Sequence, residues 1–320
     1  MPHNGCPCQC SFCNQNRITG VQKQPTPQEV ERIIEDSASY MGESVKSAEI
    51  AFFGGSFTAI DRNYMISLLE VAHKAVKKYG FIGIRCSTRP DKIDEEVLTI
   101  LKRYSVSSIE LGAQSMSDKV LFLNDRGHSS EDVVKASALI KSFGFELGLQ
   151  MMTGLYGSSF EDDIITAEKL IAIHPATVRI YPTITLENTR LADLYRAGEY
   201  TPPSLEDTVS LCAKLISMFE DKDIRVIRVG LHATDEITDK RVAGPYHPAF
   251  KELCMSASLL TEVKEILLSR QKGSYIINCS PKLTSAIIGQ RRSNILELEV
   301  LGYYIKVVPD KTTERFVICS

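Results

Sequence analysis

Apolar and polar positions along the chain form two alternating patterns, short apolar runs and longer amphipathic stretches. The apolar runs have the length of buried strands and end in glycine or polar residues. In chain order, the six runs are AEIAFFGG from Ala48, FIGIRCS from Phe81, VSSIELGAQS from Val106, FELGLQMMTGL from Phe145, ATVRIYPTI from Ala176 and IRVIRVGL from Ile224.

Between these runs, apolar residues recur at the three- and four-residue spacing of a helix face. The predicted helices are one that contains Met65, Leu68, Leu69, Ala72 and Val76, and further helices at 94–104, 130–143, 160–173 and 205–220. Strands that alternate with helices form right-handed βαβ units around a parallel sheet. The sequence therefore predicts an α/β fold over residues 1–230, a barrel or part of one. Barrel enzymes place their active sites at the C-terminal ends of the strands.

The pattern changes after Gly230. The segment GPYHPAF is typical of a linker or turn, and a helix is predicted at 250–270. The strand SYIINCS, a helix that carries AIIGQRRSN, and the strands YYIKVV and RFVIC follow, with a turn at 309–311 between the last two. We predict that residues 231–320 form a small α+β domain.

The composition is that of an ordinary globular protein, with 43% hydrophobic and 24% charged residues in 320. No stretch approaches the ~20 apolar residues of a membrane span, and the start does not resemble a secretory signal. We therefore expect a cytoplasmic protein without a membrane partner. The net charge of −3 does not suggest a nucleic-acid binder, but the tail from Tyr246 onward carries ten Lys/Arg against seven Asp/Glu.

Four of the nine cysteines lie at the start of the chain, in HNGCPCQCSFCNQ. Cys6, Cys10 and Cys13 have the spacing C-x3-C-x2-C, which suits three irons of a 4Fe–4S cluster and leaves the fourth iron without a protein ligand. An open iron can bind S-adenosylmethionine and pass it an electron, since such radical chemistry needs a cofactor. The alternative is a structural zinc, which needs a fourth ligand such as Cys8 or His3. We interpret Cys8 as a bystander and the five scattered cysteines as buried apolar residues.

Several motifs follow the cysteines in a fixed order: FFGGSFT, STRPD, IELGAQS, LNDRGH and GLQMMTGLYG. Together they resemble the radical SAM superfamily, and within it the radical SAM domain of the Elongator catalytic subunit, in a stand-alone form. The resemblance runs from residue 2 to about residue 230. It implies a partial (β/α)6 TIM-like barrel. Relatives have a strand before the cysteine loop, whereas five residues precede Cys6 here, so we expect the first strand to be missing through truncation.

The resemblance also implies a role for individual residues. Gly54, Gly55 and Ser56 match the segment that receives the amino group of S-adenosylmethionine, although two glycines after a strand are more often only a turn. Glu110 and Gln114 match the ribose-binding positions, with a solvated strand end as the alternative. The remaining cofactor candidates are Arg126 for the methionine carboxylate, Phe12 as a shield near the adenine, and Thr88 at the barrel mouth. For His128 we expect a structural hydrogen bond.

The implied activity is reductive cleavage of S-adenosylmethionine to a 5′-deoxyadenosyl radical, which abstracts a substrate hydrogen. Tyr156 stands where the family has proline, and Gln150 where the Elongator subunit has histidine; these departures concern the substrate more than the cofactors. The tail also resembles stand-alone relatives rather than an acetyltransferase domain.

The first substrate hypothesis is tRNA, bound through basic tail residues (Lys272, Lys282, Arg291, Arg292, Lys306 and Arg315). The alternatives are a small-molecule or peptide substrate and an inactive cluster-binding protein. A flavodoxin or ferredoxin is the expected electron donor.

Overall fold

The computed structural model describes residues 6, 9–13, 24–231 and 240–319. Contacts divide the chain into two compact units. Unit 1 comprises Met1–Pro203 and Phe219–Pro245, and unit 2 comprises Ser204–Met218 and Tyr246–Ser320. This division differs from the boundary that we predicted at residue 230, because the chain passes between the units more than once. A change of pattern along the sequence cannot reveal such a return.

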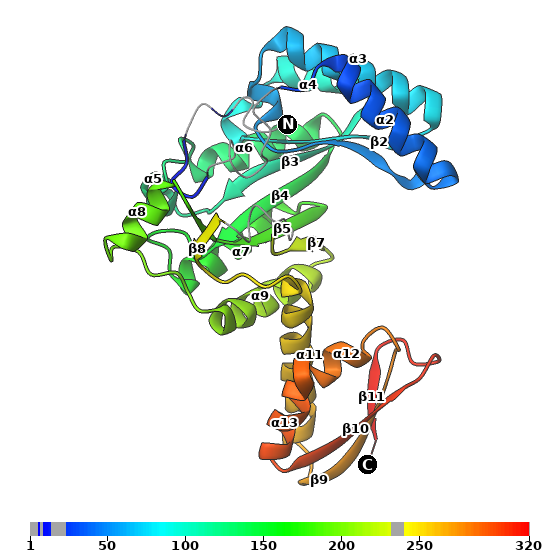
Figure 1. Ribbon diagram of the computed structural model, residues 1–320, viewed down its shortest axis with the longest axis vertical. Helices are drawn as coiled ribbons and strands as arrows, with labels where there is room; N and C mark the ends of the chain where they lie inside the picture. The colour runs from blue at the N-terminus through cyan, green and yellow to red at the C-terminus, as the bar shows by residue number, and fades with distance from the viewer. Residues whose placement is uncertain (1–5, 7–8, 14–23, 232–239, 320) are drawn as a thin grey trace. The chain divides into compact units, whose positions relative to one another are not determined.

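A six-stranded sheet forms the centre of unit 1 (Figure 1). Its strand order is β1-β2-β3-β4-β5-β7, and every neighbouring pair is parallel. The six strands are β1 (Glu49–Phe52), β2 (Gly83–Thr88), β3 (Val106–Gln114), β4 (Glu146–Thr153), β5 (Thr177–Pro182) and β7 (Arg225–Val229). All six predicted strands are confirmed. In the described residues before Glu49 there is no strand, and β1 forms one edge of the sheet.

Helices connect these strands. They are α2 (Pro27–Met41), α3 (Arg62–Tyr79), α4 (Glu95–Arg103), α5 (Asp118–Leu123), α6 (Ser130–Ser142), α7 (Phe160–Ile173), α8 (Arg190–Arg196) and α9 (Leu205–Glu220), with short 3-10 helices η1 (Gly42–Ser47), η2 (Phe57–Ala59) and η3 (Pro90–Lys92). The five predicted helices of this region are confirmed. Ser129 caps α6 in a capping box with Asp132. We did not predict α2, α5 or α8. A two-stranded antiparallel sheet, β6 (Thr185–Leu186) with β8 (Arg241–Ala243), was also missed.

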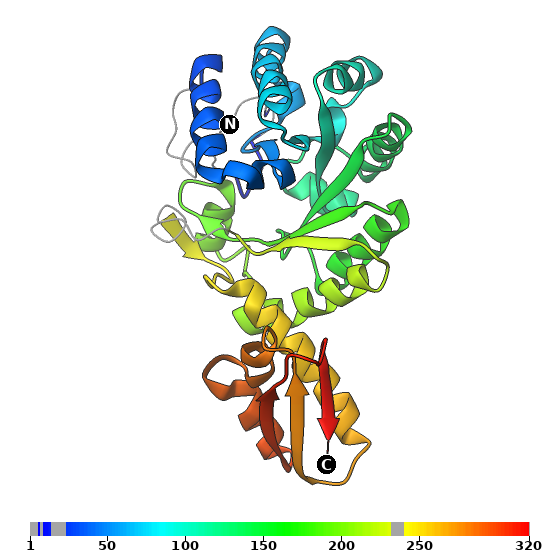
Figure 2. The same cartoon turned by 90° about the vertical axis from the view of Figure 1, so that its right-hand side faces the viewer.

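The two faces of the six-stranded sheet differ in chemistry. One face carries the fully buried aliphatic residues, such as Ile109 and Leu149, and the helices α3, α4, α6 and α7 pack along it. Figure 2 shows these helices together on one side of the strands. The other face carries charged and polar side chains. The guanidinium of Arg179 on β5 lies 4.9 Å from the ring centroid of Phe53, which follows β1. Because β1 and β5 are not neighbours in the sheet, this contact shows that the sheet curls around its polar face, as a partial barrel does.

Unit 2 is an α+β unit with a three-stranded sheet of order β10-β9-β11. Besides part of α9, its elements are α11 (Phe250–Leu268), β9 (Gly273–Cys279), α12 (Thr284–Ile288), η4 (Gln290–Arg292), α13 (Ser293–Val300), β10 (Tyr303–Pro309) and β11 (Phe316–Cys319). β10 runs parallel to β9, and β11 runs antiparallel to it. Leu259, Val263 and Leu267 of α11 pack with Ile277 and Ile318 of the sheet in one apolar core.

The predicted α+β class is confirmed, but one predicted helix of unit 2 is wrong. The segment AIIGQRRSN is not a single helix, because Gly289, Arg291 and Arg292 have positive φ angles and separate α12 from α13. No described helix combines the length and the apolar character that crossing a membrane requires.

Candidate active site

The cysteine loop is attached to unit 1 through Ser11, which is fully buried. The backbone N–H of Ser11 donates to the carbonyl of Asn124 at 3.1 Å, and its hydroxyl donates to Asn124 Oδ1 at 2.7 Å. The carbonyl of Ser11 accepts from the N–H of Leu191 at 2.8 Å. Asn124 also donates to the carbonyl of Tyr156 at 2.9 Å. Asn124, a residue that we did not predict, therefore joins the cysteine loop to the loop after β4.

The three predicted cluster ligands have different exposure. Cys6 is exposed, Cys10 is buried and Cys13 lies between these extremes; none of them is in a disulfide. The loop turns tightly, with the N–H of Cys13 donating to the carbonyl of Cys10 at 3.0 Å. Cys8 lies outside the described residues. In the part of the chain that the structure describes, no three His, Cys, Asp or Glu side chains gather around a position for a single metal ion.

The sulfur of Cys6 lies in a mixed environment. Although the residue as a whole is exposed, desolvation of its sulfur raises the pKa of the thiol, and the neighbouring Cys10 raises it further. Arg126, Arg89 and a hydrogen bond from the backbone N–H of Ser56 act in the opposite direction. Cys6 thus lies beside Cys10, two arginines and the glycine-rich segment after β1.

Arg126 is buried and links the cysteine loop to the end of β3. Its Nη1 donates to Cys10 Sγ at 3.3 Å, and its Nη2 donates to the carbonyl of Gly112 at 2.7 Å. Its Nε is buried and has no hydrogen-bond partner among the residues that the structure describes. Arg89 Nη2 donates to the backbone carbonyl of Arg126, while Arg89 Nε donates to Asp91 at 2.8 Å. The guanidinium is therefore held in place, and its Nε is a buried donor that no other described residue uses.

Gln114 lies next to this guanidinium. A side chain on Gly112 would meet Gln114 Nε2 at 3.0 Å and Arg126 Nη2 at 3.2 Å, so the absence of one makes room for both groups. Gln114 has a φ of 66°, which is unfavourable for a residue other than glycine, and it follows a register shift in the pairing of β3 with β4. Gln150 Nε2 donates to Gln114 Oε1 at 3.1 Å. The strand end is shaped so that Gln114 faces Arg126.

Ser56 and Thr88 are also side by side, but their hydroxyl protons are already used. Thr58 donates to the carbonyl of Lys92 at 2.6 Å and must therefore accept from Thr88 at 2.6 Å. Thr88 in turn accepts from Ser56 at 2.9 Å, and Ser56 accepts from the N–H of Arg89 at 3.3 Å. Each hydroxyl has one proton, so this chain runs in one direction. This series of hydrogen bonds leaves acceptor lone pairs but no free hydroxyl donor at Ser56 and Thr88.

Gly54, Gly55 and Phe12 complete the predicted cofactor set. Gly54 has a φ of 104°, in the range that favours glycine, and it lies directly after Phe53. Gly55 and Phe12 are half-buried. The segment that contains the two glycines reaches the cysteine loop through the contact of Ser56 with Cys6.

The structure does not bring Glu110 into this group. Glu110 is 2% exposed and lies in a buried ion network on the polar face of the sheet. Its Oε1 is 3.3 Å from Arg85 Nη1 and 3.0 Å from Arg179 Nη2, and its Oε2 is 2.7 Å from Arg179 Nε, although that last pair is not aligned for a hydrogen bond. Arg85 also contacts Glu49 at 2.8 Å and Glu146 at 2.9 Å. Glu110 lies four residues before Gln114, the last residue of β3. Its side chain therefore lies on the face of the sheet and not at the strand end, where Gln114 lies.

His128 is buried and neutral. Its Nε2 lies 3.2 Å from the carbonyl of Ala113, as the expected structural hydrogen bond requires. Because a carbonyl only accepts, Nε2 carries the proton, and the buried Nδ1 has no partner in the described part of the chain. Burial lowers the pKa of His128 to about 4, and Arg126 lowers it in the same direction.

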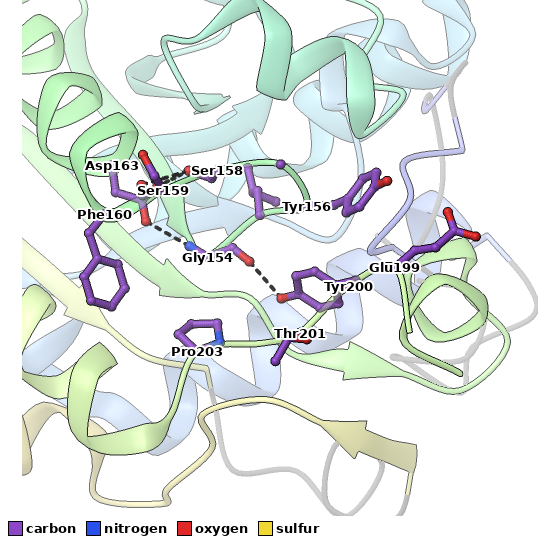
Figure 3. Close-up of a pocket in the computed structure, with 12 residues that line it drawn as sticks. Gly154, Tyr156, Ser158, Ser159, Phe160, Asp163, Glu199, Tyr200, Thr201 and Pro203 are labelled. Atoms are coloured by element: carbon purple, nitrogen blue, oxygen red, sulfur yellow. Dashed lines mark hydrogen bonds between the residues drawn. The ribbon is translucent and has the colours of Figure 1, made fainter. Parts of the chain in front are cut away.

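A cavity of about 420 Å³ lies beside the loop after β4 (Figure 3). Asp163 Oδ2 accepts from the N–H of Gly154 at 2.9 Å, and Asp163 Oδ1 accepts from Ser158 at 2.7 Å. Tyr200 donates to the carbonyl of Gly154 at 2.8 Å. Burial raises the pKa of Asp163 to about 7, because its partners are neutral donors rather than cations. These bonds fix the backbone of the loop whose Tyr156 carbonyl accepts from Asn124.

Comparison with known proteins gives consistent matches. A family model described as the radical SAM superfamily matches residues 1–170, and one described as the radical SAM C-terminal domain matches residues 175–260. A tRNA uridine(34) acetyltransferase of Methanocaldococcus infernus is 28% identical over 209 residues, which are 59% of this chain and 39% of that protein. Human Elongator complex protein 3 is 28% identical over 198 residues, 56% of this chain and 36% of that protein. The chain thus spans less than half the length of these two relatives.

Among solved structures, the Elp3 of Methanocaldococcus infernus with an N-terminal deletion is similar in fold. The TM-score is 0.63 at 24% sequence identity, and the match covers 77% of this chain and 60% of that one. This similarity confirms a partial barrel of the kind described above.

Proposed function

The chain belongs to the radical SAM superfamily, and from that membership we propose that it cleaves S-adenosylmethionine reductively to start a hydrogen abstraction on a tRNA substrate. The superfamily uses a 4Fe–4S cluster and S-adenosylmethionine, and the cluster supplies the electron for the cleavage. The observation that carries the proposal is the convergence of Cys6, Cys10 and Arg126 with the backbone of Ser56.

The residues present fit these two cofactors. Cys6, Cys10 and Cys13 lie on one loop, as ligands to three separate irons require. Among the described residues, the buried Nε of Arg126 is a donor without a partner beside the cysteines, and a carboxylate would satisfy it. We therefore assign the methionine carboxylate to Arg126. Gln114, next to that guanidinium, is the candidate for the ribose hydroxyls.

Other predicted roles need adjustment. Glu110 is committed to Arg85 and Arg179, so we assign it to the support of the polar face rather than to the ribose. Ser56 and Thr88 have acceptor lone pairs only, and an ammonium group is a donor that such lone pairs suit. Gly54 and Gly55 would let that ammonium approach the backbone, and Phe12 would cover the cluster. Arg89 and His128 would hold Arg126 and the end of β3 in place.

Similarity to tRNA-modifying proteins and the basic residues of unit 2 support tRNA as the substrate. All six of those residues are exposed. Arg315 pairs with Glu262, and Arg292 lies 3.6 Å from Glu299. The other four (Lys272, Lys282, Arg291 and Lys306) have no ion pair with another described residue, so they are the better candidates for phosphate contacts. An electron donor such as a flavodoxin or ferredoxin would complete the system.

The test is production of 5′-deoxyadenosine after anaerobic cluster reconstitution and dithionite reduction, with and without bulk tRNA. We expect that tRNA stimulates the cleavage and that high salt suppresses this stimulation, because it weakens tRNA binding. Cys8→Ala should retain the cluster absorbance, and Cys10→Ala should lose it. A reconstituted cluster without cleavage would reject the radical SAM activity. Cleavage that tRNA does not change would reject tRNA and favour a small-molecule or peptide substrate.

A further inference from the structure

The polar face of the six-stranded sheet carries an ion network with one guanidinium left over. Its salt bridges join the carboxylates of Glu49, Glu110 and Glu146 to Arg85, Arg179 and Arg225. Arg228 lies on β7 directly opposite Arg179 in the register of the sheet. It forms no ion pair with any other described residue. Two like charges at opposite positions of neighbouring strands destabilise a sheet unless something neutralises them.

Arg228 is nevertheless held in a defined position. Its Nε donates to the carbonyl of Gly230 at 3.1 Å, and Gly230 in turn donates to the carbonyl of Ile180 at 3.0 Å. Burial and the guanidinium of Arg179 lower the pKa of Arg228, while Tyr181 raises it. The two terminal nitrogens of Arg228 have no hydrogen-bond partner among the residues that the structure describes. A guanidinium anchored at Nε presents those nitrogens as a ready pair of donors.

Arg179 and Tyr181 are the neighbours of the Arg228 guanidinium on β5. Arg179 Nη1 lies 3.5 Å from the hydroxyl of Tyr181, and both residues are half-buried on the polar face of β5. Glu110 contacts Arg179 through Nε and Nη2, which leaves Nη1 turned toward Tyr181. The ring of Phe53, which precedes Gly54, lies under the guanidinium of Arg179. One side chain therefore connects this group to the glycine segment of the proposed cofactor site.

We propose that Arg228, Arg179 and Tyr181 bind an anionic group of the substrate, a phosphate or a carboxylate, on the inner face of the partial barrel. The bound anion would neutralise the surplus charge and accept from the terminal nitrogens of Arg228. Glu110 positions Arg179 for this contact, and Phe53 places the anion next to the cofactor residues. The inference rests on the proposed function only for the identity of that neighbouring site.

Binding of inorganic phosphate and of acetate to the full chain tests the proposal without any cleavage reaction. The melting temperature would be measured against anion concentration, with sodium chloride keeping the ionic strength constant. We expect a saturable stabilisation in the wild type that is roughly tenfold weaker or more in Arg228→Gln. Arg225→Gln is the matched control, because it removes the same charge from the same strand near Glu146. It should respond like the wild type.

Arg228→Lys keeps the charge but loses the paired donors, so its stabilisation by the anion should fall between those of the wild type and Arg228→Gln. This variant also keeps the test decisive if Arg228→Gln does not fold. A stronger response to phosphate assigns a phosphoryl group, and a stronger response to acetate assigns a carboxylate; either result supports the site. An absent response in the wild type, or an equal response in Arg228→Gln, would overturn it. Because dithionite and S-adenosylmethionine are not needed, failure here is distinguishable from failure of the cleavage assay.

Discussion

The two sheets of this chain use their open faces in different ways. Both sheets bury one apolar face against helices. The open face of the six-stranded sheet carries Arg85, Glu110 and Arg179, which are at most 17% exposed at their side chains and paired with one another. The open face of the three-stranded sheet carries Tyr304 and Val317, which are 60% and 54% exposed and contribute to no comparable network. Buried charge is costly to desolvate, so stability depends on the pairing of charged side chains on the first face and much less on the second.

This difference explains where the candidate chemistry gathers. Parallel strands align their C-terminal ends at one edge, and the curl of the larger sheet brings Phe53 and Arg179 together across the polar face. The smaller sheet has a fully apolar core centred on Ile277 and Leu267 and holds no buried ion pair among its described residues. Charge substitutions should therefore have large effects in unit 1 and small effects in unit 2.

The largest effect on stability is expected from Glu110→Gln. The change leaves Arg85 and Arg179 buried with one carboxylate fewer, which costs about 3–5 kcal/mol. Glu262→Gln in unit 2 is the matched control, because it breaks an ion pair whose arginine is 60% exposed. That control should cost about 1 kcal/mol or less. Denaturant unfolding measures both, and equal losses would contradict the contrast between the two faces.

A second large effect concerns Asp163, a buried carboxyl that forms no ion pair with another described residue. Its pKa of about 7 lies above the ordinary value, so the unfolded chain loses this proton first as the pH rises. The carboxyl therefore lowers the stability progressively between about pH 4 and pH 7, by up to about 4 kcal/mol, and the loss stays constant above that range. Asp163→Asn should remove this slope.

The matched control for that experiment is Asp162→Asn. Hydrogen bonds from Ser159 lower the pKa of Asp162, so its contribution to the free energy of unfolding no longer changes with pH above about pH 5. Melting temperatures would be measured between pH 8 and pH 5. As the pH falls, the values for wild type and Asp163→Asn should converge, whereas the difference between wild type and Asp162→Asn should stay constant. Parallel curves for Asp163→Asn would show that this carboxyl ionises normally.

Arg126→Lys should reduce 5′-deoxyadenosine production by about 100-fold, because a lysine cannot reach Cys10, Gly112 and a carboxylate together. Arg190→Lys is the matched control, since Arg190 is an exposed arginine that pairs with Asp125, the residue directly before Arg126. Its rate should remain within about twofold of the wild type. Undiminished cleavage in Arg126→Lys would remove this residue from the proposed cofactor site.

Local periodicity predicted the fold well because strands and long helices have strong patterns. Short helices such as α5 and α8 escaped, since six or seven residues hold too few turns to show a period. The longer α2 was not predicted, although Thr26, Pro27 and Glu29 carry the capping signal of a helix N-terminus. In unit 2, the positive φ angles at Arg291 and Arg292 were not predicted, because arginine as a residue type does not favour this conformation.

The site was less predictable because its contacts join distant parts of the chain. Arg126 and Cys10 are 116 positions apart, and no local pattern indicates that they meet. For Glu110, alternation along β3 predicts the face on which the side chain lies but not which cations lie there. Asn124 and the chain of hydroxyls from Ser56 to Thr58 were missed for the same reason. Sequence motifs therefore named the residue types, and the topology decided which of them lie together.

The smallest effect is expected on the open face of unit 2. Tyr304→Ser should change the free energy of unfolding by no more than about 0.5 kcal/mol, because the side chain is mostly exposed and carries no ion pair. Tyr303→Ser on the same strand is the matched control; Tyr303 is 4% exposed and packs in the apolar core, so its loss should cost about 3 kcal/mol. Denaturant unfolding separates the two. A large loss from Tyr304→Ser would mean that this face is covered in the folded protein, and the contrast between the two open faces would then fail.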